Sequence, residues 1–373
     1  MDAVSDIETR ALEVFEADDP GFQFKRIGDI IGDGIKPIAW LVRNYIETDS
    51  LALLFGDPGC GKSFAAIDLA CCIATGSSWH GNRTTAGAVF YIAGEGQNGL
   101  ARRFAAWEQH NLVTLSGAPL FISLRPAQLC NVAAAAEVSS AVDELARDSA
   151  QHPALIVIDT LARNFGGADE NSAQDMGAFI ANLDRFLRAK WRATVMVVHH
   201  TGHADKSRAR GSTALKGALD AEYSLTKDDA GVVRLEATKM KDAEQPQPVA
   251  FTMRTVALTD VFDDEGEPVC SVALSSVSYL PPTRSGKVGR GRNQILALSV
   301  LGTLIEEHRE RGARAGHSSE NASVKIDEWR DRLGTKGIDR KRFFELRNKL
   351  VDAGSIVIEF GVYVRLADEE RPF

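Results

Sequence analysis

The stretch GDPGCGKS, at positions 56–63, constrains the fold of this chain more than any other feature of its sequence. It matches the pattern G-x-x-x-x-G-K-[ST] at each fixed position, an apolar run precedes it, and an apolar-periodic segment follows it. Glycines let successive backbone N–H groups turn toward phosphate oxygens, and the next helix adds its positive N-terminus. The residues expected to line the phosphates are Gly56, Asp57, Pro58, Gly59, Cys60, Gly61, Lys62 and Ser63. The stretch therefore predicts a phosphate-binding loop (P-loop) between a buried strand and a helix.

A P-loop of this kind suits ATP with Mg²⁺. Lys62 is expected to reach the β- and γ-phosphates, and the Ser63 hydroxyl to ligate the metal. A carboxylate is needed on the other side of the metal, and Asp159 closes the apolar run LIVID. An aspartate at the end of a buried strand is costly unless it is paired or coordinated, and the carboxyl end of a parallel strand borders the ligand crevice. We expect Asp159 to act on Mg²⁺ through water; a structural cap is the alternative.

Short apolar runs alternate with helical segments from residue 51 to about residue 228. This alternation is typical of βαβ units and predicts an α/β fold with a mainly parallel sheet. The expected strands are 51–55, 88–93, 119–123, 154–159, 194–199 and 221–226, and the expected helices are 62–75, 98–110, 133–148 and 172–190. Beyond residue 228, short alternating strands separated by DDAG, QPQP and DDEGEP predict antiparallel strands at the sheet edge.

Length and composition divide the chain into a core and an appendage. A chain of 373 residues with 44% apolar and 25% charged residues suits a globular protein of about two domains. We expect a helical, acidic lead-in over 1–49, a core over 50–280, a linker rich in Pro, Gly and basic residues over 281–293, and a second domain over 294–373. The acidic N-terminus is unlike a signal peptide, and no apolar run is long enough to span a membrane. The odd cysteine count favours reduced thiols, so we expect a cytoplasmic protein without a membrane partner.

The expected second domain is the basic part of the chain. Residues 284–373 hold 18 Lys and Arg against 14 Asp and Glu, a net charge of +4, whereas the whole chain carries −8. Three helical segments followed by the hairpin pattern SIVIEFGVYVRL predict a winged-helix domain. The third helix carries Arg340, Lys341, Arg342, Arg347 and Lys349, with Phe343, Leu346 and Leu350 as its buried stripe. Such a helix suits duplex DNA, and docking on a replication protein is the alternative.

Five segments carry a resemblance to a known family. In chain order they are GDPGCGKS, YIAGEG, LIVIDTLARNF, VVHHTGH and RGSTALKGALDAEYSL. Together they resemble the RecA-fold ATPase core of the RepA type, the hexameric replicative helicases of plasmids, phages and mobile elements. The resemblance covers roughly residues 35–260. It implies a RecA-like core, ATP hydrolysis, a homohexamer and movement on single-stranded DNA.

The same resemblance assigns further site residues. It implies that Glu95, at the end of the second strand, is the general base for the attacking water; a turn residue is the alternative, because Gly94 and Gly96 flank it. It implies that His200 senses the γ-phosphate; a metal site formed by HHTGH is the alternative, although no Cys or carboxylate nearby completes it. A basic residue is expected to complete the neighbouring subunit's site as a finger. The sequence departs from the family here, because Asp220 stands where an Arg is expected, and this leaves Arg210, Lys239 and Lys241 as candidates.

Two polar loops are expected at the carboxyl edge of the sheet, near the nucleotide. RNFGGADENSAQ follows Asp159, and TGHADKSRARGS follows His200. In RecA-like rings these positions point into the channel and grip the DNA backbone. Lys206, Arg208 and Arg210 suit phosphate contacts, which depend on charge and not on base sequence. Solvated surface loops are the alternative.

The sequence therefore favours an ATP- and Mg²⁺-dependent motor of replication, with a winged helix that meets DNA or a partner protein. A second hypothesis is a RecA-like regulatory ATPase or sensor that switches its oligomeric state without unwinding DNA. A third is a DNA-binding regulator in which ATP controls assembly.

Overall fold

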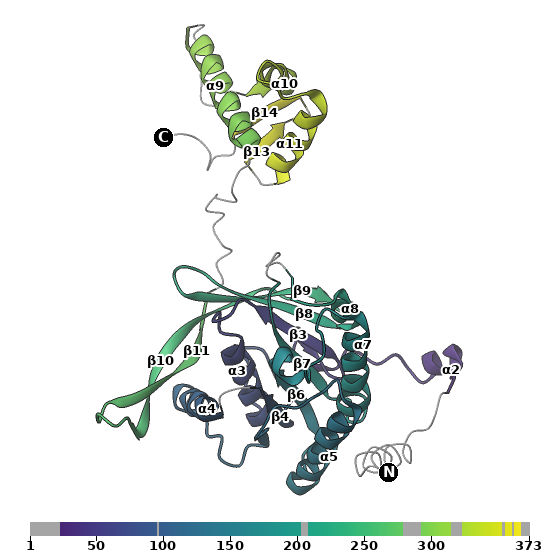
Figure 1. Ribbon diagram of the computed structural model, residues 1–373. Coiled ribbons are helices and arrows are strands. Elements are labelled where there is room, and N and C mark those ends of the chain that lie inside the picture. Colours follow the sequence, from purple (N-terminus) through teal and green to yellow (C-terminus); the bar gives the residue numbers. More distant parts are fainter. Residues whose placement is uncertain are drawn as a thin grey trace. The chain divides into compact units, whose positions relative to one another are not determined.

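The computed structural model describes residues 23–94, 97–202, 208–278, 292–314, 323–352, 355–359 and 362–366. The chain divides into two compact units, Met1–Leu280 and Pro281–Phe373, and each is described by itself. Figure 1 shows their elements. No helix among the described residues is long and apolar enough to cross a membrane.

The first unit is built around one large mixed sheet. Within the described residues, nine strands lie in the order β11-β10-β9-β8-β3-β7-β6-β4-β5. They are β3 (Leu51–Gly56), β4 (Ala88–Ala93), β5 (Leu120–Ile122), β6 (Pro153–Asp159), β7 (Thr194–His200), β8 (Ala221–Lys227), β9 (Val232–Met240), β10 (Val249–Phe262) and β11 (Pro268–Val277). The strands from β8 to β5 pair in parallel, and β9, β10 and β11 extend the sheet beyond β8, each antiparallel to the strand before it. This confirms the prediction of an α/β, RecA-like core with antiparallel edge strands.

Helices cover both faces of this sheet (Figure 1). They are α3 (Lys62–Thr75), α4 (Gln97–Asn111), α5 (Val132–Ser149), α6 (Leu161–Asn164), α7 (Ala173–Asn182), its π-helical continuation η1 (Leu183–Arg188), and α8 (Thr213–Ala218). One apolar core joins the sheet to α3 and α4, and the other joins it to α5, α7, η1 and α8. Because strand side chains alternate, Ala52 and Leu54 enter the first core, whereas Leu53 and Phe55 enter the second.

The lead-in before the sheet differs from the prediction. Ile27–Gly32 is a short helix (α2), as expected, but Trp40–Val42 (β1) and Ile46–Glu47 (β2) pair as an antiparallel hairpin. The prediction of a helix over this part is wrong. Asn44, with φ of 66°, makes the left-handed turn between the two strands, and Tyr45 packs into the first core.

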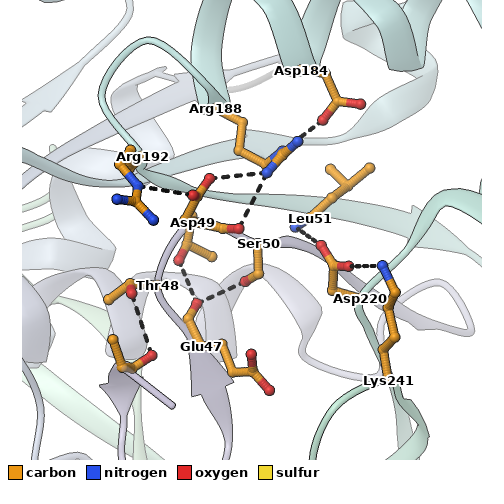
Figure 2. A network of polar contacts seen from close by, with 12 residues as sticks. Glu47, Thr48, Asp49, Ser50, Leu51, Asp184, Arg188, Arg192, Asp220 and Lys241 are labelled. Atoms are coloured by element: carbon orange, nitrogen blue, oxygen red, sulfur yellow. Dashed lines mark hydrogen bonds and ion pairs between the residues drawn. The ribbon is translucent and has the colours of Figure 1, made fainter. Parts of the chain in front are cut away.

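Polar contacts fix the start of the central strand β3 (Figure 2). Asp49, just before β3, accepts hydrogen bonds from Arg188 Nη1 at 2.9 Å and from Arg192 Nε at 3.1 Å. Both arginines follow α7 in the chain, so these ion pairs tie the start of β3 to the helical layer. The P-loop follows the other end of β3, so these contacts fix the start of the strand that leads into it.

The second unit contains three helices and a small antiparallel sheet in its described part. The elements are α9 (Arg292–Arg314), β12 (Val324–Lys325), α10 (Ile326–Gly334), α11 (Arg340–Asp352), β13 (Ile356–Glu359) and β14 (Tyr363–Leu366), and the sheet order is β12-β14-β13. Phe343, Leu346 and Leu350 are buried, as the periodicity predicted. On α9, Ala297 and Val300 are buried, whereas Ile295 is 57% exposed. Of the expected linker 281–293, only the last two residues lie within the described ranges.

Candidate ATP site

The backbone of the P-loop depends on its glycines. Gly59 and Gly61 have φ of 77° and 106°, a region that side chains with a Cβ rarely adopt. A Cβ on Gly61 would lie 2.3 Å from Met253 Cε, and one on Gly56 would lie 2.3 Å from the carbonyl oxygen of Leu225. The loop is thus pressed against the antiparallel extension as well as against β8. Helix α3 begins at Lys62, directly after Gly61, so its free N–H groups face the loop.

Lys62 lies inside the loop. Its ammonium group donates hydrogen bonds to the carbonyl oxygens of Gly56 and Asp57, each at 2.8 Å, and the residue is 5% exposed. Burial lowers the pKa of Lys62, and the negative charges of Asp159 and Asp57 oppose that shift. A buried ammonium bonded to neutral carbonyls gains from an anion placed beside it, which fits a bound phosphate.

Asp159 ends β6 and is buried. The hydroxyl of Tyr91, on β4, donates a hydrogen bond of 2.6 Å to Asp159 Oδ2. Burial raises the pKa of Tyr91, and the neighbouring Asp159 charge raises it further, so the tyrosine stays a donor. The ends of β4 and β6 lie close together, because the Gly94 amide donates a hydrogen bond of 2.6 Å to the Asp159 carbonyl. A Cβ on Gly94 would also meet Arg163 Cβ, on α6, at 2.3 Å.

The P-loop borders a cavity of about 470 Å³, a volume within the range of small-molecule sites. Its lining consists of Phe55, Gly56, Asp57, Pro58, Gly59, Cys60, Thr201, Ser224, Leu225, Thr226, Lys227 and Asp228. A larger cavity of about 860 Å³ lies between β4, β5 and α5, and its lining includes no residue of the P-loop. We assign the nucleotide to the smaller cavity, since the P-loop residues from Gly56 to Cys60 line it; Lys62 and Ser63 follow in the chain, and neither they nor Asp159 are part of its lining.

Residues at the end of β7 and just beyond it link the P-loop to the segment that carries Arg208 and Arg210. His200 pairs in register with Gly56, so it stands level with the start of the P-loop. Thr201 Oγ1 donates a hydrogen bond to Asp57 Oδ1 at 2.5 Å, and the Thr201 amide donates one to the Gly56 carbonyl at 3.2 Å. Thr201 also forms a β-bridge with Ala209, which closes the base of the loop.

Arg210 lies at this closed base. Its amide donates to the His200 carbonyl at 2.9 Å, and its carbonyl bonds to Nε2 of the fully buried His199 at 3.1 Å. Its guanidinium Nε lies 3.6 Å from Oε2 of Glu170, in the segment after β6, on the loop between α6 and α7. Burial lowers the pKa of His199 to about 4, so the ring is neutral near pH 7 and donates through Nε2.

The two lysine candidates for the finger lie elsewhere on the sheet. Lys239 pairs in register with Glu222, and the P-loop strand end pairs with Leu225, about 10 Å further along β8. The Lys239 ammonium donates to the carbonyl oxygen of Lys216 at 2.7 Å. Neither lysine lines the cavity at the P-loop of its own chain.

Asp220 explains part of the departure from the family pattern. Asp220 Oδ2 accepts a hydrogen bond from the Leu51 amide at 2.9 Å, and Oδ1 lies 3.3 Å from Lys241 Nζ (Figure 2). The carboxylate therefore anchors the start of β3 and holds Lys241 at the same time. An arginine at position 220 could not accept the Leu51 hydrogen bond.

Several expected site residues fall outside the described ranges, namely Glu95, Lys206 and His203. Arg208 is described and exposed, at the base of the loop that contains Lys206. In the described part of the chain, no three His, Cys, Asp or Glu side chains gather as metal ligands. Mg²⁺ keeps several water ligands and needs few protein groups, so Ser63 and Asp159 suit it.

The basic helix α11 presents its charges outward. Arg340, Lys341, Arg342 and Lys349 are exposed, while Arg347 is half-buried over the ring of Phe344. Asp339 caps the helix by accepting a hydrogen bond from the Arg342 amide at 2.9 Å. The helix thus combines a buried apolar stripe with an exposed basic face.

Sequence reasoning missed three residues of the site: Tyr91, Glu170 and Thr201. Tyr91 lies in an apolar strand, where its hydroxyl gives no signal of a polar partner. Glu170 and Thr201 lie in loops whose contacts depend on the sheet order.

A comparison with protein families decides the general class. A family model described as an AAA domain matches residues 17–206, half of the chain. The chain belongs to the AAA domain family. The matched range includes the P-loop, Asp159 and His200 and ends before Arg208 and Arg210, and the match shows that the chain is a P-loop ATPase. No curated protein matches this sequence.

Proposed function

We propose that this AAA-domain ATPase is a RepA-like motor that hydrolyses ATP to move along single-stranded DNA during replication of a mobile element. The contact of Thr201 with the P-loop carries this proposal. It joins the nucleotide site directly to a loop base that bears Arg208 and Arg210. A motor needs such a link, because a change at the phosphates must move the groups that grip the polynucleotide.

The residues suggest how the chain would promote hydrolysis. Lys62 and the P-loop amides would bind the β- and γ-phosphates and stabilise the charge that develops on them. Ser63 and Asp159 would hold Mg²⁺, which neutralises phosphate charge when bound. Glu95 would accept a proton from the attacking water, and His200 would contact the γ-phosphate.

The ring is part of the proposal. Arg210, Lys239 and Lys241 are the residues proposed to complete a neighbour's site, in a homohexamer. Lys239 and Lys241 are supported by their rigid place at the end of β9, where each is fixed by a contact with a neighbouring segment.

The second unit would bind duplex DNA or a replication protein. Its element order, helix–strand–helix–helix–strand–strand, is that expected of a winged helix. The exposed basic face of α11 supports contact with a phosphate backbone. Protein docking by the same unit is the alternative.

A regulatory ATPase that changes assembly without moving on DNA is the second candidate function. The two differ in how ATP hydrolysis responds to DNA. We expect single-stranded DNA to raise the steady-state ATPase rate of the full chain several-fold. Lys62→Ala should abolish the ATPase rate both with and without DNA. An ATPase rate that single-stranded DNA leaves unchanged would argue against the motor.

A further inference from the structure

Glu170 connects the segment after β6 to the segment after β7, at the carboxyl edge of the sheet. Its carbonyl oxygen accepts a hydrogen bond from the Ser212 amide at 3.0 Å. A Cβ on Gly211, where φ is +91°, would lie 2.8 Å from that same oxygen. The loop after β6 and the loop after β7 are therefore in direct contact at Glu170.

The side chain of Glu170 is paired poorly. Its exposed fraction is 13%, and Oε2 lies 3.6 Å from Arg210 Nε and 3.9 Å from His199 Nε2. Among the described residues, no donor is close enough to hydrogen-bond Oε2. The neutral ring of His199 supplies no charge. Within the residues that the structure describes, Arg210 is the cation that faces this carboxylate, and the distance of 3.6 Å is longer than that of a hydrogen bond.

Arg210, in contrast, is open to a competing anion. Its side chain is 45% exposed, and its backbone is fixed by His199 and His200. A phosphodiester group can accept two parallel hydrogen bonds from a guanidinium, which is a stronger pairing than a single ion pair at 3.6 Å. A phosphate that reaches Arg210 would therefore replace Glu170.

We propose that Glu170 and Arg210 form a latch: Arg210 is a contact for the phosphate backbone of single-stranded nucleic acid, and Glu170 holds it until a phosphate displaces the carboxylate. The inference rests on the proposed function and adds two features to it. It assigns Arg210 to the polynucleotide and leaves Lys239 and Lys241 as finger candidates. It also connects binding to the ATP site, because the loop base that holds Arg210 is bonded to the P-loop through Thr201.

The latch predicts that loss of the Glu170 charge raises the affinity for single-stranded nucleic acid, whereas a merely structural contact predicts that the affinity falls. Glu170→Gln keeps the shape but removes the competing charge, so it should tighten binding of a short labelled oligothymidylate about threefold or more. If Glu170 only supported the loop, removal of its charge would weaken binding instead. Asp169→Asn is the matched control: it removes the same charge from the adjacent residue, whose carboxylate bonds to Asn171 instead. We expect Asp169→Asn to change affinity by less than Glu170→Gln.

A double-mutant cycle then isolates the pair. Arg210→Gln should weaken binding and reduce the slope of log affinity against log salt by about 0.7, the value for one phosphate on a single strand. In the Arg210→Gln background, Glu170→Gln should have no larger effect than Asp169→Asn. Binding of a labelled ATP analogue by each variant checks that the site remains folded.

The outcomes separate the latch from the function on which it rests. If the wild-type chain binds no oligothymidylate, the proposed motor and the latch both fail. If the wild type binds but Glu170→Gln lowers affinity, matches Asp169→Asn, or acts equally without Arg210, the latch alone is overturned.

Discussion

Asp159 ends β6, and the hydroxyl of Tyr91, two residues before the end of the neighbouring strand β4, donates a hydrogen bond of 2.6 Å to Asp159 Oδ2. This bond fixes the carboxylate that sequence reasoning assigned to the metal. It leaves Oδ1 as the oxygen that can face a water ligand of Mg²⁺. Tyr91 is fully buried, so its hydroxyl needs a partner inside the protein, and Asp159 supplies it.

Tyr91→Phe should therefore raise the Mg²⁺ concentration that ATPase activity requires, with a smaller effect on the affinity for nucleotide. Removing the donor leaves a buried carboxylate oxygen unsatisfied, at a cost of about 1–3 kcal/mol. We expect the Mg²⁺ concentration for half-maximal ATPase activity to rise several-fold. Tyr45→Phe is the control, because it removes a hydroxyl that bonds to the Gln247 carbonyl instead. Equal Mg²⁺ dependence in both variants would show that the Tyr91 hydroxyl does not orient Asp159.

His199 should make the stability of the first unit sensitive to acid. Its pKa is lowered by burial from 6.5 to about 4, so the unfolded chain takes up a proton near pH 6.5 while the folded chain does not. Stability present above pH 6.5 is therefore lost as the pH falls toward 4, by at most about 3 kcal/mol. His199→Gln should show a smaller loss of the urea midpoint between about pH 7 and about pH 5 than the wild type. His152→Gln, at an exposed position, should behave as the wild type does, and an unchanged loss in His199→Gln would contradict this account.

The sequence predicted most of the first unit because its elements follow simple periodicities. The helix expected over 62–75 has those bounds, since the Gly61 turn begins it and Gly76, with φ of 71°, ends it. The hairpin at 40–47 was missed because the apolar residues of WLVRNYIE also fit a helical spacing. Only the left-handed turn at Asn44 breaks that pattern.

Site residues that belong to a local motif could be predicted from the sequence. Contacts that depend on the order of the strands in the sheet could not. The P-loop and Asp159 follow from local sequence, and the strand order brings β3, β7 and β6 side by side. The pairing of Glu170 with Arg210 joins residues of two separate loops, and no local pattern indicates it. The same holds for Asp220, whose value as an anchor for Leu51 depends on the pairing of β8 with β3.

Removal of residues 287–373 should leave a folded ATPase. The buried residues of the second unit form a core of their own, which shares no residue with the two cores of the sheet. Binding to duplex DNA should weaken, and the slope of log affinity against log salt should fall by about 0.9 for each phosphate that the shortened chain no longer neutralises. A thermal melt tests whether the shortened chain is folded, and a salt titration of duplex binding measures the slope. An unchanged slope would show that the basic face of α11 does not bind the duplex.

A finger supplied by a neighbouring subunit predicts recovery of activity in mixtures. Lys62→Ala should lose ATPase activity about 100-fold or more in its own site, because it removes charge stabilisation of the transferred phosphoryl group. Lys239→Ala or Lys241→Ala should instead damage the neighbour's site. Mixing either finger variant with Lys62→Ala creates some interfaces with both parts intact, so part of the activity should return after subunit exchange. Two separately labelled preparations of Lys62→Ala serve as the control, and exchange without recovery for either lysine would exclude both as fingers.

The central claim, that hydrolysis drives movement on DNA, is tested most directly by strand displacement on a forked duplex with single-stranded arms. The account predicts that the full chain releases the labelled strand only with hydrolysable ATP and Mg²⁺. Lys62→Ala should release none, and the mass in solution should approach six copies of the 40.4 kDa chain when a slowly hydrolysed ATP analogue is present. A wild-type protein that hydrolyses ATP, binds the single-stranded arms and assembles, yet releases no strand on forks of either polarity, would contradict the motor and favour the regulatory ATPase.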